Sequence, residues 1–297
     1  MSVERAQELA VWQQDLAQAG YIAEPSLVAA LLLMQDLQRP LLLEGDAGVG
    51  KTEVAKVLAT MHKTRLIRLQ CYEGLDAHSA MYEWNYQRQL LAIKLLEHDE
   101  RGIAQKEQDI FSDRYLLKRP LLEAITCEQA PVLLIDEVDR ADEAFEAYLL
   151  ELLSDFQLSI PELGTVHAVT RPLVVITSNG TRELSDALRR RCLYQYIDYP
   201  DYDKELTIVR TKAPEVPAAL AQQIVAFVQS VRRMELQKKP GIAETLDWAA
   251  ALLRLGISVI DKDGAERIMQ TLSALIKTRD DRVAFPREVV ARLAAAC

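Results

Sequence analysis

The sequence predicts an α/β fold in which a parallel sheet is followed by a smaller, all-helical domain. Apolar strand segments alternate with helical segments as far as about residue 200, which is the pattern of a parallel sheet covered by helices. A glycine-rich stretch at residues 45–52 lies between a strand and a helix. Beyond residue 200 the strand signals fade and helical periodicity continues to the end. We therefore expect an α/β domain over residues 1–200, with a leading helix at 1–20, and a helical domain over residues 201–297.

Each element is indicated by its local pattern. Residues 3–19 have their apolar side chains on one helical face, and Gly20 ends this helix. A second helix begins near Pro25 and stops before Pro40, because the residue before a proline disfavours helical angles. Continuous apolar runs predict buried parallel strands, and two short alternating runs around a turn predict a β-hairpin. The remaining expected helices cover residues 53–59, 80–98, 121–129 and 143–156, and the expected strands cover residues 41–43, 66–69, 131–135, 158–160, 165–169 and 172–176.

The composition is ordinary for a globular chain, with 49% hydrophobic and 27% charged residues. The net charge of −9 argues against a protein that tracks along nucleic acid, although it leaves room for a local basic patch. No basic and apolar leader opens the chain, and no apolar stretch is long enough to span a bilayer. Four cysteines, without metal-binding or redox spacing, predict reduced thiols in a cytoplasmic protein: Cys71, Cys127, Cys192 and Cys297.

Residues 45–52 fit the P-loop pattern G-x-x-x-x-G-K-[ST] without deviation. Its glycines permit backbone angles that a Cβ would forbid, so that N–H groups and the following helix N-terminus face phosphate groups. Lys51 is expected to reach the β- and γ-phosphates, and the Thr52 hydroxyl to bind Mg²⁺. A purely structural turn is the alternative, which the flanking strand and helix disfavour. The predicted nucleotide-binding residues are Gly45, Asp46, Ala47, Gly48, Val49, Gly50, Lys51 and Thr52.

Polar residues follow two of the expected buried strands, at the strand ends where ligands bind in open α/β sheets. Asp136 would hold Mg²⁺ and Glu137 would polarise the attacking water. Asn179, at the tip of the next strand, offers an amide donor and acceptor to the γ-phosphate or the water. Asp139 and Arg140 could contact a neighbouring subunit or the water shell of the metal. Solvated turns are the alternative for both strand ends, but the order of these residues after a P-loop favours catalysis.

A short helix over residues 184–191 ends in three arginines, Arg189, Arg190 and Arg191. Cations at a helix C-terminus interact favourably with the macrodipole, which is the simpler explanation. Three arginines exceed what a helix end needs, however, and arginine offers phosphate a planar, permanently charged donor group. We therefore expect an arginine finger, a side chain that completes the site of an adjacent subunit.

This ordered set of motifs resembles the AAA+ ATPases over about residues 20–200. Within that superfamily the sequence is most similar to the MoxR branch, and there to the CoxD-type ATPases of carbon-monoxide-dehydrogenase gene clusters. The resembling stretches are residues 39–45, 119–122, 138–142, 176–184, 190–194 and 239–248.

The resemblance implies an AAA+ core with a five-stranded parallel sheet in the order 5-1-4-3-2, a helical lid, and a hexameric ring with ATP at the subunit boundaries. It implies Mg²⁺-dependent hydrolysis of ATP to ADP and phosphate. Arg191 would be the first candidate for the finger and Arg190 the second. Tyr21 and Ile22 lie where related proteins cradle adenine.

The resemblance also implies a chaperone that remodels or matures a client metalloenzyme, of the molybdenum hydroxylase or CO dehydrogenase type, with a partner carrying a von Willebrand factor A (VWA) domain. An insert around residues 74–86 and the hairpin at 158–169 would line the pore or face the client. No nucleic acid is expected as a partner. An AAA+ motor or loader acting on nucleic acid is the alternative, and a P-loop kinase of small substrates is a third candidate.

One departure from the family concerns the lid. Many AAA+ lids present a sensor-2 arginine at the start of a helix, whereas residues 242–248 contain Glu244 and Thr245 and no arginine. Arg287 is a candidate replacement.

Overall fold

The computed structural model describes residues 3–95 and 102–297 and confirms the predicted α/β fold with a helical C-terminal region. The described chain forms two compact units. One contains the chain up to Glu24, residues 45–54 and residues 196–297, and the other contains residues 25–44 and 55–195. The P-loop therefore belongs to the unit that holds the C-terminal helices, and the predicted boundary at residue 200 remains a prediction.

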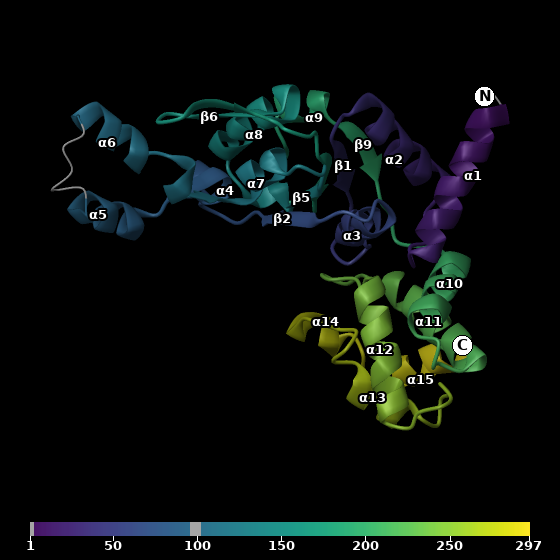
Figure 1. Cartoon of the computed structure of the whole chain (residues 1–297). Coiled ribbons are helices and arrows are strands. Elements are labelled where there is room, and N and C mark those ends of the chain that lie inside the picture. Colours follow the sequence, from purple (N-terminus) through teal and green to yellow (C-terminus); the bar gives the residue numbers. More distant parts are fainter. Residues whose placement is uncertain (1–2, 96–101) are drawn as a thin grey trace. The chain divides into compact units, whose positions relative to one another are not determined.

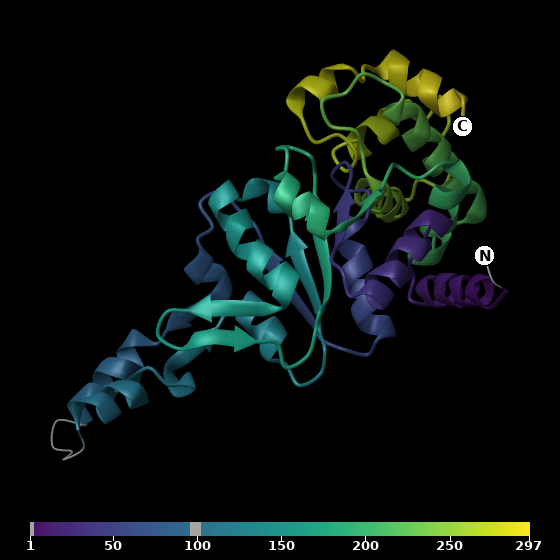
Figure 2. The ribbon, with the colours of Figure 1, turned by 90° about the horizontal axis from the view of Figure 1, so that it is seen from above.

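A five-stranded sheet forms the centre of the second unit (Figure 2). Its order is β2-β5-β8-β1-β9, which corresponds to the predicted 5-1-4-3-2 when the five core strands are counted along the chain. The β2–β5, β5–β8 and β1–β8 pairs are parallel. The strands are β1 (Leu41–Glu44), β2 (Leu66–Gln70), β5 (Val132–Asp136), β8 (Leu173–Ser178) and β9 (Leu193–Tyr196).

The apolar runs of β5 and β8 form the core with the helices that pack on them. Leu133 and Ile176 share one fully buried cluster with Leu121, Phe145 and Leu149, and burial of each such side chain contributes about 1.5–3 kcal/mol. A β-hairpin follows, as predicted. Other helices and strands of this unit are α2 (Pro25–Leu37), α7 (Pro120–Thr126), η2 (Val138–Arg140), α8 (Glu143–Asp155), β6 (Gln157–Ile160), β7 (Gly164–His167) and α9 (Asp186–Arg191). The helix α3 (Lys51–Met61) begins in the first unit and continues into this one.

The helix predicted over residues 80–98 is wrong near its start, where a short strand interrupts it. The chain forms α4 (Ala77–Met81), β3 (Tyr82–Trp84) and α5 (Tyr86–Leu95), and residues 96–98 lie outside the described part. β3 pairs antiparallel with β4 (Leu116–Lys118). Tyr82 and Trp84 are buried on one face, where Trp84 packs edge-on against Phe111, so tertiary packing overrides the local helical pattern.

The segment between β3 and β4 covers residues 85–115, whereas the insert predicted at residues 74–86 falls mainly on α4 and β3. The segment between β3 and β4 carries α5, α6 (Ile103–Ile110) and η1 (Asp113–Tyr115), and α5 and α6 project beyond the sheet (Figures 1 and 2). The helix predicted over residues 121–129 also ends earlier, at Thr126.

The C-terminal region is helical, as predicted. Phe227 and Trp248 are fully buried at its centre, with ring centroids 4.8 Å apart. No helix in the described ranges is both long and apolar enough to cross a membrane. The helices of this unit are α1 (Val3–Gln18), α10 (Tyr202–Lys212), α11 (Ala218–Arg232), α12 (Ile242–Arg254), α13 (Ala265–Thr271), α14 (Arg279–Val283) and α15 (Arg287–Ala295).

Candidate nucleotide site

The P-loop runs from the end of β1 into the first turn of α3. The backbone φ is +81° at Gly48 and +98° at Gly50, which side chains of L-residues rarely permit. Lys51 is 6% exposed, and its Nζ donates to the carbonyl oxygens of Gly45 and Asp46, both at 2.7 Å. A buried ammonium beside a helix N-terminus suits a polyphosphate. Of the other predicted loop residues, Val49 is buried, Ala47 is exposed, and Thr52 lies half-buried in the first helical turn.

Tyr21 and Ile22 lie between α1 and α2, and the structure brings Tyr21 beside the P-loop. A Cβ on Gly50 would lie 3.9 Å from the Tyr21 ring. Burial, with smaller effects from the charges of Glu24 and Glu53, raises the pKa of the Tyr21 phenol, so the ring remains neutral. Ile22 is half-buried. Contact of these residues with adenine remains a prediction.

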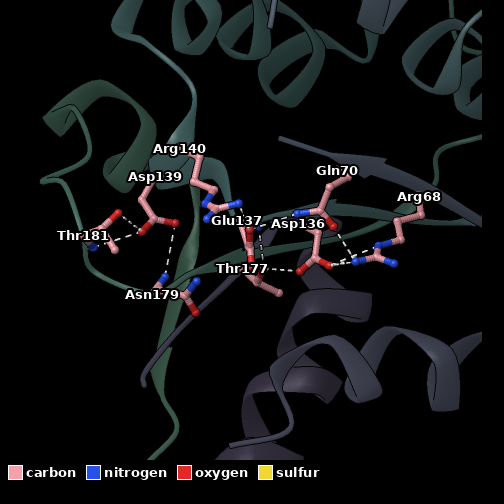
Figure 3. A network of polar contacts seen from close by, with 9 residues as sticks. All are labelled: Arg68, Gln70, Asp136, Glu137, Asp139, Arg140, Thr177, Asn179 and Thr181. Carbon is pink, nitrogen blue, oxygen red and sulfur yellow. Dashed lines mark hydrogen bonds and ion pairs between the residues drawn. The ribbon is translucent and has the colours of Figure 1, made fainter. Parts of the chain in front are cut away.

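Asp136 is the last residue of β5, in the unit that contains the five-stranded sheet (the sheet unit), and its carboxylate is almost completely buried. Its Oδ2 accepts from Arg68 Nε at 3.1 Å and from Arg68 Nη2 at 2.5 Å (Figure 3). Its Oδ1 accepts from the Thr177 hydroxyl at 2.5 Å. A buried anion requires such partners. Arg68 is not among the residues predicted from the sequence. The signal that could indicate it is that Arg68 and Gln70 lie on one face of β2, the strand that pairs with β5.

Glu137 follows in a left-handed conformation, with φ 55° and ψ 50°, which costs of order 1 kcal/mol for a residue with a Cβ. Its N–H donates to Thr177 Oγ1 at 2.9 Å, which fixes the turn after β5. The carboxylate accepts from Gln70 Nε2 and pairs with Arg140, both at 3.1 Å. The Glu137 side chain is 32% exposed, so solvent water reaches it.

Asp139 is buried and holds the segment that follows β8. Its Oδ1 accepts from the Asn179 backbone N–H at 3.2 Å, and its Oδ2 accepts from the backbone N–H and the hydroxyl of Thr181 at 3.0 and 2.6 Å (Figure 3). Burial alone would raise the pKa of Asp139, but these hydrogen bonds lower it below its ordinary value. Asp139 therefore positions the backbone of Asn179, and a contact of Asp139 with a neighbouring subunit stays a prediction.

The three arginines of α9 have different surroundings. Arg189 pairs with Glu44 at 3.2 Å. Arg191 donates to the Ser154 hydroxyl and, at 3.1 Å, to the carbonyl oxygen of Ala187. The Arg190 side chain is 82% exposed, and its ion pair with Asp186 is long, at 4.0 Å. Arg190 is thus the arginine of α9 that projects into solvent, whereas Arg191 is bonded to residues of α8 and α9.

Two charged residues without a role predicted from the sequence, Arg39 and Glu146, hold the ends of α9. Arg39 donates to the carbonyl oxygens of Arg190 at 2.6 Å and Arg191 at 3.2 Å. The fully buried Glu146 accepts from the Ser185 N–H at 2.9 Å, and Ser185 is the N-cap of α9. The sequence signal that could indicate Glu146 is its position as an acidic residue on the otherwise apolar face of α8.

The predicted magnesium ligands are chemically suitable, since Mg²⁺ prefers hydroxyl and carboxylate oxygens. Thr52 supplies the first kind and Asp136 the second. Because both Asp136 oxygens already accept hydrogen bonds, contact through a metal-bound water fits better than direct ligation. Within residues 3–95 and 102–297, no group of three or more His, Cys, Asp or Glu side chains could hold a metal ion by itself.

Comparison with known proteins gives the class. Residues 40–192 match the AAA domain (dynein-related subfamily), and the chain belongs to this family. Domains of this family bind and hydrolyse nucleotides in general, and AAA+ proteins typically assemble into rings. The predicted AAA+ fold is therefore confirmed.

Several proteins are similar along most of the chain. An uncharacterized protein of Staphylococcus haemolyticus is 26% identical over 260 residues, which is 85% of this chain and 88% of that one. One from Staphylococcus saprophyticus is 27% identical over 282 residues, covering 92% and 95%. Among solved structures, a mutant of RuvB from Thermotoga maritima has a TM-score of 0.48 at 18% identity, covering 92% of this chain and 72% of that one.

Proposed function

We propose that the chain is a Mg²⁺-dependent ATPase of the MoxR type, in which the P-loop and the polar ends of β5 and β8 act on one ATP. The observation that carries this proposal is the register of the sheet. Glu44 of β1 pairs with Ser178 of β8, and Ile176 of β8 pairs with Ile135 of β5. The P-loop begins one residue after Glu44, so the chain enters it at the edge of the sheet where β5 and β8 also end.

In this mechanism Lys51 and the loop N–H groups bind the β- and γ-phosphates. Thr52 and, through a water, Asp136 would hold Mg²⁺, which when bound would neutralise charge on these phosphates. Glu137 orients a water molecule and accepts a proton from it. The oxygen of this water forms the new bond to the γ-phosphorus, while the bond between that phosphorus and the bridging oxygen breaks and ADP leaves. Asn179 donates to the γ-phosphate or to this water.

We propose Arg190 as the first candidate for the finger and Arg191 as the second. A finger must leave its own subunit, and Arg190 is the exposed guanidinium, whereas Arg191 is tied to Ser154 and Ala187. Arg39 would keep the α9 C-terminus in position for this reach. The active form would then be a ring, which we propose to be a hexamer, because a single subunit lacks one part of its site.

The client contact that we propose is the projecting segment between β3 and β4. α5 leaves Leu90, Leu91 and Leu95 each at least 60% exposed, and clustered exposed apolar side chains indicate protein contacts. A hollow of about 490 Å³ opens at the base of this segment, beside the β6–β7 turn. It is lined by Ser79, Tyr82, Glu83, Trp84, Tyr86, Arg119 and Glu162.

The identity of the partners rests on the resemblance alone. A client metalloenzyme of the molybdenum hydroxylase type, a VWA-domain partner and a cytoplasmic setting are the corresponding proposals. Copurification with a VWA-domain protein encoded nearby, and activation of the client only in the presence of ATP, are the expected results.

The test is the ATPase rate against protein concentration, for wild type mixed with Arg190→Ala. The proposal requires that the rate per subunit rise with concentration, and that the variant lower it by more than dilution. Arg191→Ala serves as the matched control and should lower it less. A rate independent of concentration would contradict the shared site, and stimulation by DNA that disappears with salt would favour the nucleic-acid motor.

A further inference from the structure

The start of α12 lies directly against the P-loop, within one compact unit. The Ile242 N–H donates to the Gly48 carbonyl oxygen at 2.9 Å. A Cβ on Gly241 would lie only 2.7 Å from the Cα and the oxygen of Gly48. A Cβ on Gly48 would in turn lie 3.1 Å from the Gly241 Cα. The two main chains therefore touch with no side chain between them.

This contact orients one phosphate-binding group of the loop. In a trans peptide the carbonyl and the N–H point in opposite directions. Because α12 holds the Gly48 carbonyl, the Val49 N–H of the same peptide faces away from α12. P-loops bind phosphates through such backbone N–H groups. The Ile242 N–H, for its part, is a first-turn donor that has no partner within its own helix.

The contacting end of α12 is fixed to the helical core. Arg232 Nε donates to the Pro240 carbonyl oxygen at 2.7 Å, and its guanidinium makes two 2.6 Å bonds to the buried Glu205. The Thr245 hydroxyl donates to the same carboxylate at 2.8 Å. The Glu244 carboxylate accepts from the Gly241 N–H at 2.9 Å. The Gly241 backbone therefore moves with α10, α11 and α12.

We propose that Gly241 and Ile242 are positioning residues that couple the helical region to nucleotide through the main chain. This coupling takes the place of the arginine that residues 242–248 lack, and it rests on the proposed nucleotide site. A phosphate-filled loop holds the Gly48 carbonyl outward and strengthens its bond to Ile242. By reciprocity, loss of this bond weakens nucleotide binding.

Gly241→Ala tests the contact, with Gly102→Ala as its control. The Gly241 backbone is extended, with φ −86° and ψ −171°, so alanine fits its conformation and only the approach to Gly48 is disturbed. Among the residues that the structure describes, none has an atom within 4 Å of the Cβ position of Gly102. We expect Gly241→Ala to raise the dissociation constant of Mg-ADP about tenfold, equivalent to 1.4 kcal/mol, and Gly102→Ala to leave it unchanged.

A second pair of variants removes the donor alone. Ile242 is the first residue of α12, where proline is tolerated, and Ile242→Pro lacks the N–H. Ile242→Ala loses the side chain but keeps the N–H. Isothermal titration should show weaker Mg-ADP binding for Ile242→Pro than for Ile242→Ala, at equal melting temperatures. These variants decide the matter if Gly241→Ala does not fold.

Hydrogen exchange of the Ile242 amide gives an independent readout. Mg-ADP should slow this exchange in wild type and have no effect on it in Gly241→Ala. If wild type itself does not bind Mg-ADP, the proposed function fails. If wild type binds it, and all variants bind equally well with unchanged exchange, the main-chain coupling is overturned and the proposed function stands.

Discussion

The buried ion pair of the helical region offers the sharpest test of its energetics. Glu205 is fully buried and Arg232 is 7% exposed. Of the described side chains, Arg232→Leu would leave Gln229 and Thr245 as the donors to the Glu205 carboxylate, at 2.8 Å each. Removal of one partner from such a pair costs about 3–5 kcal/mol. At 2–4 °C per kcal/mol, the melting temperature should fall by roughly 6–20 °C.

Thermal unfolding followed by tryptophan fluorescence measures this loss, since Trp248 lies in the same core. The double variant Arg232→Leu with Glu205→Leu should be more stable than the single one, because no unpaired charge remains. Arg65→Leu is the control, since it breaks an exposed pair with Glu123 and should cost under about 1 kcal/mol. A single-variant loss below about 1 kcal/mol, or a double variant less stable than the single, would refute the reasoning.

Three further predictions concern the sheet unit. Glu137→Gln should lower the hydrolysis rate by about 10²–10⁴-fold while ATP binding, measured by titration, is retained; an unchanged rate would remove Glu137 from the mechanism. Because the folded-state pKa of Asp139 is lowered, its stabilising effect is fully present above about pH 4 and is lost as the pH falls through its folded pKa. In Asp139→Asn the free energy of unfolding, measured against pH, should therefore fall less steeply at acid pH than in wild type. Burial raises the pKa of Cys71 and Cys192 to about 12. Iodoacetamide at pH 8 should therefore alkylate them about a thousandfold more slowly than an ordinary thiol. Fast alkylation in the native state would contradict their burial.

The sequence predicted those elements whose cause is local. β5 and β8 are continuous apolar runs, and such runs are buried wherever a parallel sheet forms. The P-loop is specified by glycines whose backbone angles other residues rarely adopt. The periodicity of α11 and α12 likewise predicts one buried face each.

The remaining features depend on residues far apart in the chain. β3 has only three residues, and it exists because Tyr82 and Trp84 pack across from β4, more than 30 positions later. β9 is similarly short, with two exposed tyrosines. The roles of Arg68 and Arg39 arise from partners 68 and 151 positions away, which no local pattern reveals.

The β3–β4 pairing also has a consequence for how this protein could diversify. Trp84 at the end of β3 pairs with Leu116 at the start of β4. The segment between these strands therefore begins and ends at points about one strand spacing apart, roughly 5 Å. Because both ends of this segment are held close together, its length and sequence could change while the register between β3 and β4 stays the same. If this segment is the client contact that we propose, exchange of residues 85–115 between relatives would transfer client preference and leave the strands of the central sheet unchanged.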